Sequence, residues 1–158
     1  MGVATLKKVE ELEPAEKELR ATCKGWADEI EAAVSGNLYR CGGCGERVVV
    51  EVEVGTCPYC GAEIDTTAND APNLSIYDVL ESELDTSYRV DCNLEYLSGE
   101  IYVGLGGPTV HIDTGAKAVV GTWASDKAQF ALTTDAVDEL DEILRDMYES
   151  KRDARKKH

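Results

Sequence analysis

The sequence CGGCGERVVVEVEVGTCPYCG, residues 41–61, decides how the first half of the chain folds. It contains two Cys-x-x-Cys-Gly motifs, and 12 residues separate Cys44 from Cys57. Two residues between cysteines let both sulfurs of one tight turn face a single ion, and two such turns complete a tetrahedron. The predicted ligands of a closed, structural zinc site are therefore Cys41, Cys44, Cys57 and Cys60.

The residues between the two motifs alternate valine with charged residues, which is typical of a strand. Twelve residues are enough for a hairpin that brings the motifs together. The pattern predicts one strand face formed by Val48, Val50, Val52 and Val54. Glycines after the cysteines allow the tight curl of each turn, and Pro58 stiffens the second one.

Residues 38–64 resemble a rubredoxin-like zinc ribbon, which implies a structural metal. Iron remains an alternative, because four thiolates do not by themselves select the metal. Thioredoxin-like redox chemistry is less favoured, because neither motif opens a helix in a βαβ unit. A ribbon this small buries little apolar surface, so we expect metal binding to supply much of its folding free energy.

The composition limits the class of protein and of partner. The 158 residues are 43% hydrophobic, which suits one ordinary domain or two small ones. The formal net charge is −15, with −13 in residues 66–150 and +4 in residues 151–158. Such a field repels nucleic-acid backbones everywhere except at the tail. The simplest role of the acidity is solubility.

The sequence predicts neither secretion nor membrane insertion. No apolar run reaches the roughly 18 residues of a membrane span. The first 14 residues, MGVATLKKVEELEP, have no apolar signal core. We therefore expect an intracellular protein, whose six cysteines are reduced thiols or ligands rather than disulfides.

Apolar residues recur at helical spacing along residues 12–37. Pro14 suits a first helical turn, and the residues at 35–37, Ser-Gly-Asn, are a stop signal. One apolar face is predicted for this helix, formed by Leu12, Leu19, Cys23, Trp26, Ile30 and Val34. The position of Cys23 on that face favours a small buried hydrophobic residue over a ligand or a redox group.

The second half of the chain changes to a period of two, which predicts an α+β fold with an antiparallel meander. A short helix over 75–84 comes first, with Ser75 as its N-cap and Asp78 in a near-capping-box position. The turns between strands are too short for parallel crossovers. The predicted strands cover residues 88–97, 100–105, 109–113, 118–124 and 129–132.

Residues 133–152 have the pattern of an acidic amphipathic helix. Thr134 is the predicted cap, and Lys151 and Arg152 near the end agree with the helix dipole. The apolar stripe is expected to cover the sheet, with a homodimer seam as the alternative. Its residues are Val137, Leu140, Ile143, Leu144 and Met147.

Five segments follow from these patterns. They are an N-terminal amphipathic helix over 1–37, the ribbon over 38–64, a linker over 65–74, the α+β unit over 75–152 and a basic tail over 153–158.

Three other motifs suggest chemistry, but each has a simpler structural reading. Asp113-Thr114-Gly115 matches the catalytic tripeptide of aspartic proteases, yet only 43 residues follow it, too few for the rest of that fold. The glycine-rich residues 104–108 lack the lysine of a phosphate loop and enter a strand. His111 lies in a predicted strand as a structural histidine. We therefore predict that the protein is not an enzyme.

Residues 106–144, GGPTVHIDTGAKAVVGTWASDKAQFALTTDAVDELDEIL, resemble a group of small uncharacterised proteins from phages and mobile elements of gut bacteria. The shared features are the GGP turn, Asp113-Thr114, Trp123 and the acidic helix. The resemblance implies a mobile-element origin and hence a place in the cytoplasm of a host bacterial cell. It also implies, by analogy, a protein that occupies a host macromolecular complex, such as a CRISPR effector, as an anti-CRISPR or anti-defence inhibitor.

The leading hypothesis is thus a non-catalytic binder whose acids meet a basic, nucleic-acid-binding surface of a host protein or nucleoprotein complex. The expected contact residues are Glu81, Glu83, Asp85, Asp138, Glu139, Asp141, Glu142 and Asp146. The alternative is a zinc-ribbon nucleic-acid or transcription adaptor that uses Arg40, Arg47 and the tail 151–157. A small hydrolase acting through Asp113 is the third candidate.

Overall fold

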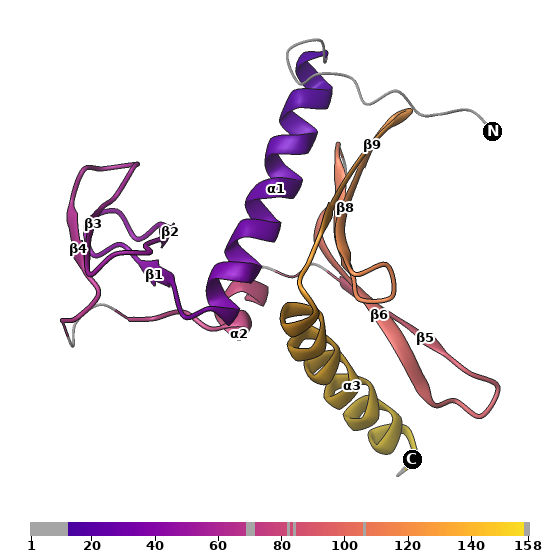
Figure 1. The fold of residues 1–158 in the computed structure, drawn as a ribbon. Coiled ribbons are helices and arrows are strands. Elements are labelled where there is room, and N and C mark those ends of the chain that lie inside the picture. The colour runs from indigo at the N-terminus through magenta and orange to yellow at the C-terminus, as the bar shows by residue number, and fades with distance from the viewer. Residues whose placement is uncertain (1–12, 69–71, 82, 84, 106, 157–158) are drawn as a thin grey trace.

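The computed structural model describes residues 13–68, 72–81, 83, 85–105 and 107–156, and it has the predicted α+β fold (Figure 1). Two two-stranded sheets form the ribbon, and one five-stranded sheet forms the larger part. The elements in chain order are α1 (Pro14–Val34), β1 (Leu38–Arg40), β2 (Arg47–Val49), β3 (Val54–Thr56), β4 (Glu63–Asp65), α2 (Ile76–Leu80), β5 (Asp85–Val90), β6 (Tyr96–Gly104), β7 (Thr109–Asp113), β8 (Ala118–Trp123), β9 (Asp126–Ala131) and α3 (Thr134–Lys156).

The larger sheet is an antiparallel meander in the order β5-β6-β7-β8-β9, as the short turns predicted. Ile112 lies opposite Ile101 of β6 and Val119 of β8, so the apolar side chains of three strands share one face. Helix α1 packs across β8 and β9 on this face, and α3 packs on β6 (Figure 1). The main core lies between these helices and the sheet.

Helix α1 approaches β8 closely because Gly121 has no side chain. A Cβ atom there would lie 2.3 Å from the Cys23 sulfur and 2.8 Å from a Leu19 methyl carbon. Cys23 is fully buried in the main core, and burial raises the pKa of its thiol. The predicted role of Cys23 as a small buried hydrophobic residue is therefore confirmed. Leu12, the first residue of the predicted stripe, lies outside the described residues.

The single predicted strand over residues 88–97 is in fact the ends of two strands, because residues 91–95 form a hairpin turn between them. Strand β5 ends at Val90 and β6 begins at Tyr96. The Asp91 carboxylate accepts hydrogen bonds from the backbone N–H groups of Asn93 and Glu95, at 2.8 and 2.9 Å. An aspartate that binds its own backbone two residues on stabilises a turn. The Ser-Gly pair at 98–99, predicted as a turn, lies inside β6.

The two other helices begin close to their predicted positions. In α2 the Asp78 carboxylate accepts from the N–H and the hydroxyl of Ser75, both at 2.7 Å, which forms the predicted capping contact. This helix ends at Leu80 rather than at residue 84. In α3 the capping side chain is Thr133, not Thr134, because the Thr133 hydroxyl oxygen accepts from the Ala136 N–H at 3.3 Å.

The stripe of α3 meets the sheet as predicted. Val137, Leu140, Ile143 and Leu144 are buried in the main core, and Met147 packs against it. The helix continues to Lys156, so most of the predicted basic tail is helical, while residues 157 and 158 lie outside the described part.

Candidate metal centre and acidic groove

Each Cys-x-x-Cys motif forms the tip of a short antiparallel hairpin. The first motif joins β1 to β2, and the second joins β3 to β4. This arrangement corrects the prediction of one hairpin within the 12-residue insert, since β2 and β3 do not pair with each other. Val48 and Val50 are buried, whereas Val52 and Val54 are exposed, so the four valines do not form one strand face.

The two turns have the same hydrogen-bonding pattern. In the first, Gly45 N donates to the Cys41 carbonyl at 2.8 Å, and Cys41 N donates to the Glu46 carbonyl. In the second, Gly61 N donates to the Cys57 carbonyl at 2.9 Å, and Cys57 N donates to the Ala62 carbonyl. Gly45 and Gly61 have φ values of 79° and 76°, a conformation that favours glycine. The sequence repeat is thus also a structural repeat.

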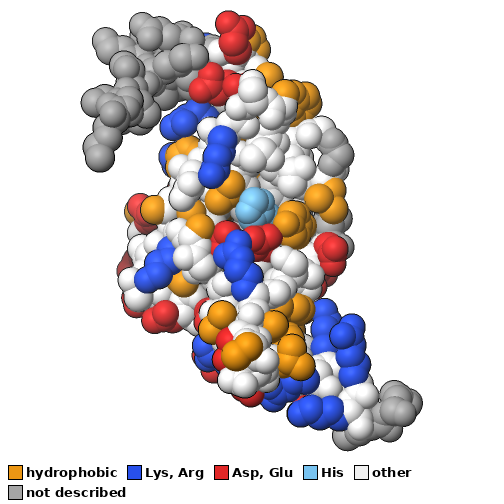
Figure 2. All heavy atoms as spheres, turned by 90° about the vertical axis from the view of Figure 1, so that its right-hand side faces the viewer, with side chains coloured by type: hydrophobic (Ala, Val, Ile, Leu, Met, Phe, Trp, Pro, Cys, Tyr) orange, Lys and Arg blue, Asp and Glu red, His pale blue; other side chains and the backbone are white. Residues whose placement is uncertain are grey.

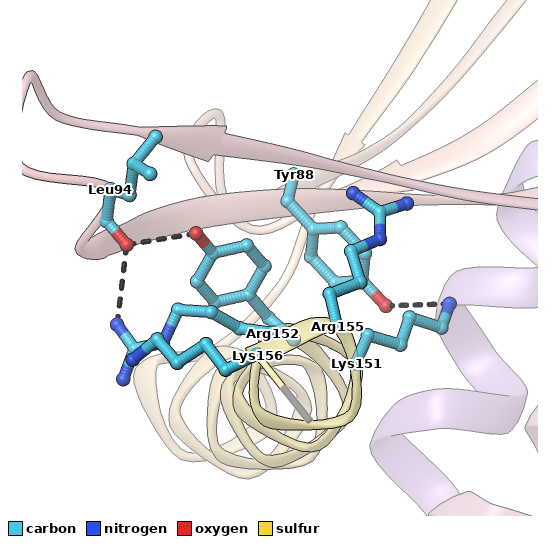
Figure 3. Close-up of a pocket in the computed structure, with 7 residues that line it drawn as sticks. Tyr88, Leu94, Lys151, Arg152, Arg155 and Lys156 are labelled. Carbon is cyan, nitrogen blue, oxygen red and sulfur yellow. Dashed lines mark hydrogen bonds between the residues drawn. The ribbon is translucent and has the colours of Figure 1, made fainter. Parts of the chain in front are cut away.

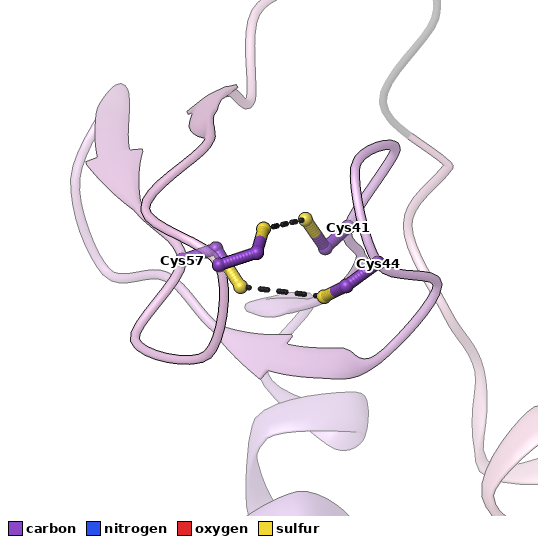
Figure 4. A group of neighbouring side chains, drawn as sticks. Cys41, Cys44 and Cys57 are labelled. Carbon is purple, nitrogen blue, oxygen red and sulfur yellow. Dashed lines mark hydrogen bonds between the residues drawn. The ribbon is translucent and has the colours of Figure 1, made fainter.

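The four cysteine sulfurs converge from these two turns (Figure 4). Cys41 and Cys60 have their sulfurs 3.6 Å apart, and Cys44 and Cys57 have theirs 3.7 Å apart. All four lie within 4.8 Å of one another. Sulfurs about 2.3 Å from a tetrahedral zinc ion would be about 3.8 Å apart, so the spacing suits such an ion. The predicted four-cysteine cluster is confirmed as a possible metal site, and no metal is identified.

The thiols of the cluster affect one another's ionisation. Backbone N–H groups of Cys44 and Gly43 lower the pKa of Cys41 to about 6. The Glu46 backbone contact lowers the pKa of Cys44, but desolvation and the other three cysteines outweigh it and raise that pKa to about 12. The Cys41 thiolate therefore forms readily, whereas desolvation and the neighbouring cysteines oppose a second thiolate at Cys44. A cation among the sulfurs would remove that opposition.

The ribbon is attached to the rest of the protein through Arg47, at the start of β2. The Arg47 guanidinium donates to the backbone carbonyls of Asp78 and Val79 in α2, both at 3.3 Å. It also pairs with the Glu29 carboxylate of α1 at 2.9 Å and lies over the Trp26 ring. One side chain therefore joins the ribbon to two helices. The sequence did not predict this role, since Arg47 was named only for the alternative of a nucleic-acid adaptor.

The predicted partner-binding acids of α3 line a shallow groove beside α2. This acidic groove has a volume of about 520 Å³. Its lining residues are Tyr77, Asp138, Glu139, Glu142, Ile143 and Asp146. The Tyr77 side chain is 65% exposed, although it is a large aromatic residue on a helix. The groove thus combines negative charge with an exposed aromatic ring.

The other four predicted contact residues lie elsewhere. Glu81, Glu83 and Asp85 are exposed between α2 and the start of β5, with Glu81 3.8 Å from Arg40. The Asp141 side chain is mostly buried, and it does not line the groove. Its carboxylate accepts from Tyr96, Thr114 and Arg145 at 2.7, 3.0 and 3.0 Å. Asp141 therefore connects α3 to the sheet.

His111 is next to Ile112 in β7, whose side chain is in the main core, so the His111 side chain lies on the opposite face of the meander. Figure 2 shows the face of the molecule on the meander side, with charged and hydrophobic side chains on it. The His111 ring stacks on Tyr102, with ring centroids 5.3 Å apart. Glu100, His111 and Asp113 together have the donor atoms of a possible metal site. The Arg89 guanidinium, however, already bridges Glu100 and Asp113, and this cation balances both carboxylates.

Asp113, the aspartate of the Asp-Thr-Gly motif, is buried and fully engaged. It accepts from two Arg89 nitrogens at 3.1 and 3.0 Å and from the Ala116 N–H at 2.9 Å. Burial would raise the pKa of its carboxyl, but Arg89 and the backbone N–H groups outweigh burial and lower that pKa. The motif closes the turn between β7 and β8.

Comparison of the chain with protein-family models, curated proteins and solved structures gives no match. The resemblance of residues 106–144 to phage proteins therefore rests on the sequence motifs alone. Across the part of the chain that the structure describes, no helix combines the length and apolarity that a membrane crossing requires.

Proposed function

We propose that this chain is a non-catalytic, metal-stabilised binding protein whose acidic groove takes a basic surface of a protein partner. The observation that carries the proposal is the groove between α2 and α3, with the exposed Tyr77 beside Asp138, Glu142 and Asp146. Aromatic residues set in a charged surround are typical of the residues that dominate protein–protein binding. The acids supply steering and selectivity for a cationic partner.

The four-cysteine cluster has a structural role in this proposal. Cys41, Cys44, Cys57 and Cys60 would hold the metal, and zinc is the ion we propose, because it favours four thiolates in a tetrahedron. The ion would crosslink two hairpins that have few buried residues of their own. Native mass spectrometry of the purified chain should find one zinc per molecule, and a metal-free chain would contradict the assignment.

Two of the three features that suggested a nucleic-acid adaptor, Arg40 and Arg47, are engaged within the chain, and the tail 151–157 is the third. Arg47 is committed to α1 and α2, and the Arg40 guanidinium donates to the Gly45 carbonyl at 3.2 Å beside Glu81. Both cations therefore serve the ribbon itself. An origin in a mobile element and inhibition of a host defence complex remain predictions from the sequence resemblance, and a homodimer remains a prediction from α3.

Charge reversal tests the groove directly. The variant Asp138→Lys/Glu142→Lys/Asp146→Lys is compared with the unmodified chain in affinity capture from a bacterial lysate at low and high salt. The control Glu18→Lys/Glu51→Lys/Glu53→Lys has the same change in charge on exposed residues elsewhere.

The groove variant should lose its captured partners by about tenfold or more, because like charges across an interface cost several kcal/mol. The control should keep them, and high salt should release them from the unmodified chain. Equal capture by both variants would contradict the proposal. If a Tyr77→Ala variant captured the partners normally, the aromatic ring would not be part of the binding surface.

A further inference from the structure

A second, positively charged pocket lies at the other end of α3, against the hairpin of β5 and β6 (Figure 3). This basic pocket has a volume of about 380 Å³. Its lining residues are Tyr88, Leu94, Tyr148, Lys151, Arg152, Arg155 and Lys156. Four of these seven carry positive charge, in a chain whose formal net charge is −15.

In the part of the chain that the structure describes, two of the four cations of the basic pocket pair with carboxylates: Arg152 with Glu95 and Asp153, and Lys156 with Asp153. Lys151 and Arg155 form no ion pair with any carboxylate in the described part of the chain. The Lys151 ammonium instead donates to the Tyr88 hydroxyl at 3.2 Å. Arg152 donates to the Leu94 carbonyl at 3.3 Å and is 3.5 Å from Glu95. Although the chain has 31 acidic residues, the positive charges of Lys151 and Arg155 are therefore available to an external anion.

The walls of the pocket are aromatic and apolar. The rings of Tyr88 and Tyr148 have centroids 5.4 Å apart, and the Tyr148 hydroxyl donates to the Leu94 carbonyl at 2.8 Å. Lys151 lies over the Tyr88 ring, and Arg152 lies over the Tyr148 ring. A ligand that fits these walls needs an apolar, planar part beside its negative charge.

Leu94 is an unexpected residue for its position. Its φ is 62°, a left-handed conformation in which a bulky side chain is strained, and its side chain is 60% exposed. Glycine or asparagine would suit the backbone of this turn better. Lys117 and Ala124, in the turns before β8 and β9, are also left-handed, so this conformation is shared by the turns of the meander. What distinguishes the turn at the pocket is the exposed apolar side chain of Leu94.

We propose that the basic pocket binds a free nucleotide. The phosphate would lie on Lys151, Arg152 and Arg155, and the base would pack against Leu94 and the tyrosine rings. The volume lies at the small end of the roughly 300–1,000 Å³ that ligand sites occupy. A free nucleotide is preferred over a long strand, because the net charge repels a polyanion but opposes a short anion much less.

A simpler role of these cations is to complement the dipole at the C-terminal end of α3. That role requires no ligand, and it does not explain the aromatic and apolar walls of the pocket. The two accounts differ in what a neutral substitution does. Under both accounts, loss of charge would lower the stability of α3. Only a nucleotide site would also lose affinity for a nucleotide.

Isothermal titration calorimetry with adenosine monophosphate tests the proposal on the full chain. Adenosine and inorganic phosphate, each alone, should bind about tenfold more weakly or not at all, because each keeps only part of the contacts. No heat from adenosine monophosphate at millimolar concentration would overturn the proposal. Tighter binding of a single-stranded oligonucleotide would overturn it in favour of strand binding.

Three variants locate the site. Lys151→Gln/Arg155→Gln should weaken binding by about tenfold or more, since two charge-assisted contacts are lost. The control Lys17→Gln/Lys127→Gln, with the same charge change on exposed residues, should bind normally. Leu94→Gly should weaken binding while it keeps or raises the unfolding temperature, because it relieves the left-handed strain. Normal affinity in Leu94→Gly and in the double Gln variant would overturn the proposal.

Discussion

The ribbon and the helix-covered sheet of this protein are held together in different ways. Among the described residues, the main core contains 21 buried residues, which come mainly from the three helices and the large sheet and include Leu38 of β1. The ribbon core contains six, and two of these, Cys41 and Cys57, are members of the cysteine cluster. Burial of apolar surface can stabilise the first region, but the buried surface of the second is too small to do so. The comparison shows that one short chain can combine a hydrophobic core with a coordination-dependent fold.

Loss of the cysteine cluster should have the largest effect, and only on the ribbon. Cys44→Ser/Cys60→Ser removes one ligand from each turn. Structural zinc contributes about 10–16 kcal/mol of binding free energy in small zinc-dependent folds. We expect the bound metal, measured by native mass spectrometry, to fall from one ion to none.

Cys92→Ser is the control for that experiment, because Cys92 is exposed and lies outside the cluster. It should keep one metal ion. The unfolding transition of the large sheet, followed by tryptophan fluorescence, should persist in both variants. Its disappearance in Cys44→Ser/Cys60→Ser would show that the two regions fold as one unit.

Filling the contact between α1 and β8 should damage the main core instead. Gly121→Ala places a methyl group 2.3 Å from the Cys23 sulfur, so α1 must move. We expect a loss of about 3 kcal/mol in the free energy of unfolding, measured by urea denaturation. Gly25→Ala is the control, because nothing lies within 4 Å of its Cβ, and it should stabilise α1 by about 0.5–1 kcal/mol. Equal effects would refute the close contact.

The connection between the two regions should depend on Arg47. Arg47→Ala removes the hydrogen bonds to Asp78 and Val79 and the ion pair with Glu29. We expect a loss of about 2 kcal/mol, because hydrogen bonds to a charged group are removed from a partly buried site. Arg47→Lys should recover only part of it, since an ammonium cannot reproduce the planar fork. Thermal unfolding measures both, and full recovery by lysine would contradict this geometry.

The smallest expected effect is a pH dependence that belongs to the sheet. The pKa of Asp113 is lowered from its ordinary value of 3.8, so the folded state favours the charged carboxylate. Its contribution to stability is present above that value and is lost as the pH falls through the folded pKa. Asp113→Asn should therefore flatten the acid side of the stability profile, measured by denaturation at pH values from neutral to below the ordinary pKa. An unchanged acid profile would contradict the role of Arg89.

The sequence predicted features that depend on local patterns. The spacing of the cysteines, the apolar stripes of α1 and α3, and the turn at 114–117 all depend on nearby residues. The next turn was predicted slightly late, at 125–127, whereas β8 ends at Trp123 and β9 begins at Asp126. The turn at 91–95 was missed because it uses the Asp91 side chain rather than glycine or proline. The contacts of Arg47 and Gly121 were also missed, since their partners are distant in the chain. Charge alone predicted an acidic surface, but not that Asp141 connects α3 to the sheet.

Amide hydrogen exchange before and after chelation tests the central claim most directly. The claim is that a metal bound by the four cysteines stabilises the fold of the ribbon, whereas the main core stabilises the large sheet. After removal of the metal, residues 38–65 should exchange at rates close to those of an unfolded chain, and β6 to β8 should stay protected. Protection of residues 38–65 that is unchanged without metal would contradict the account.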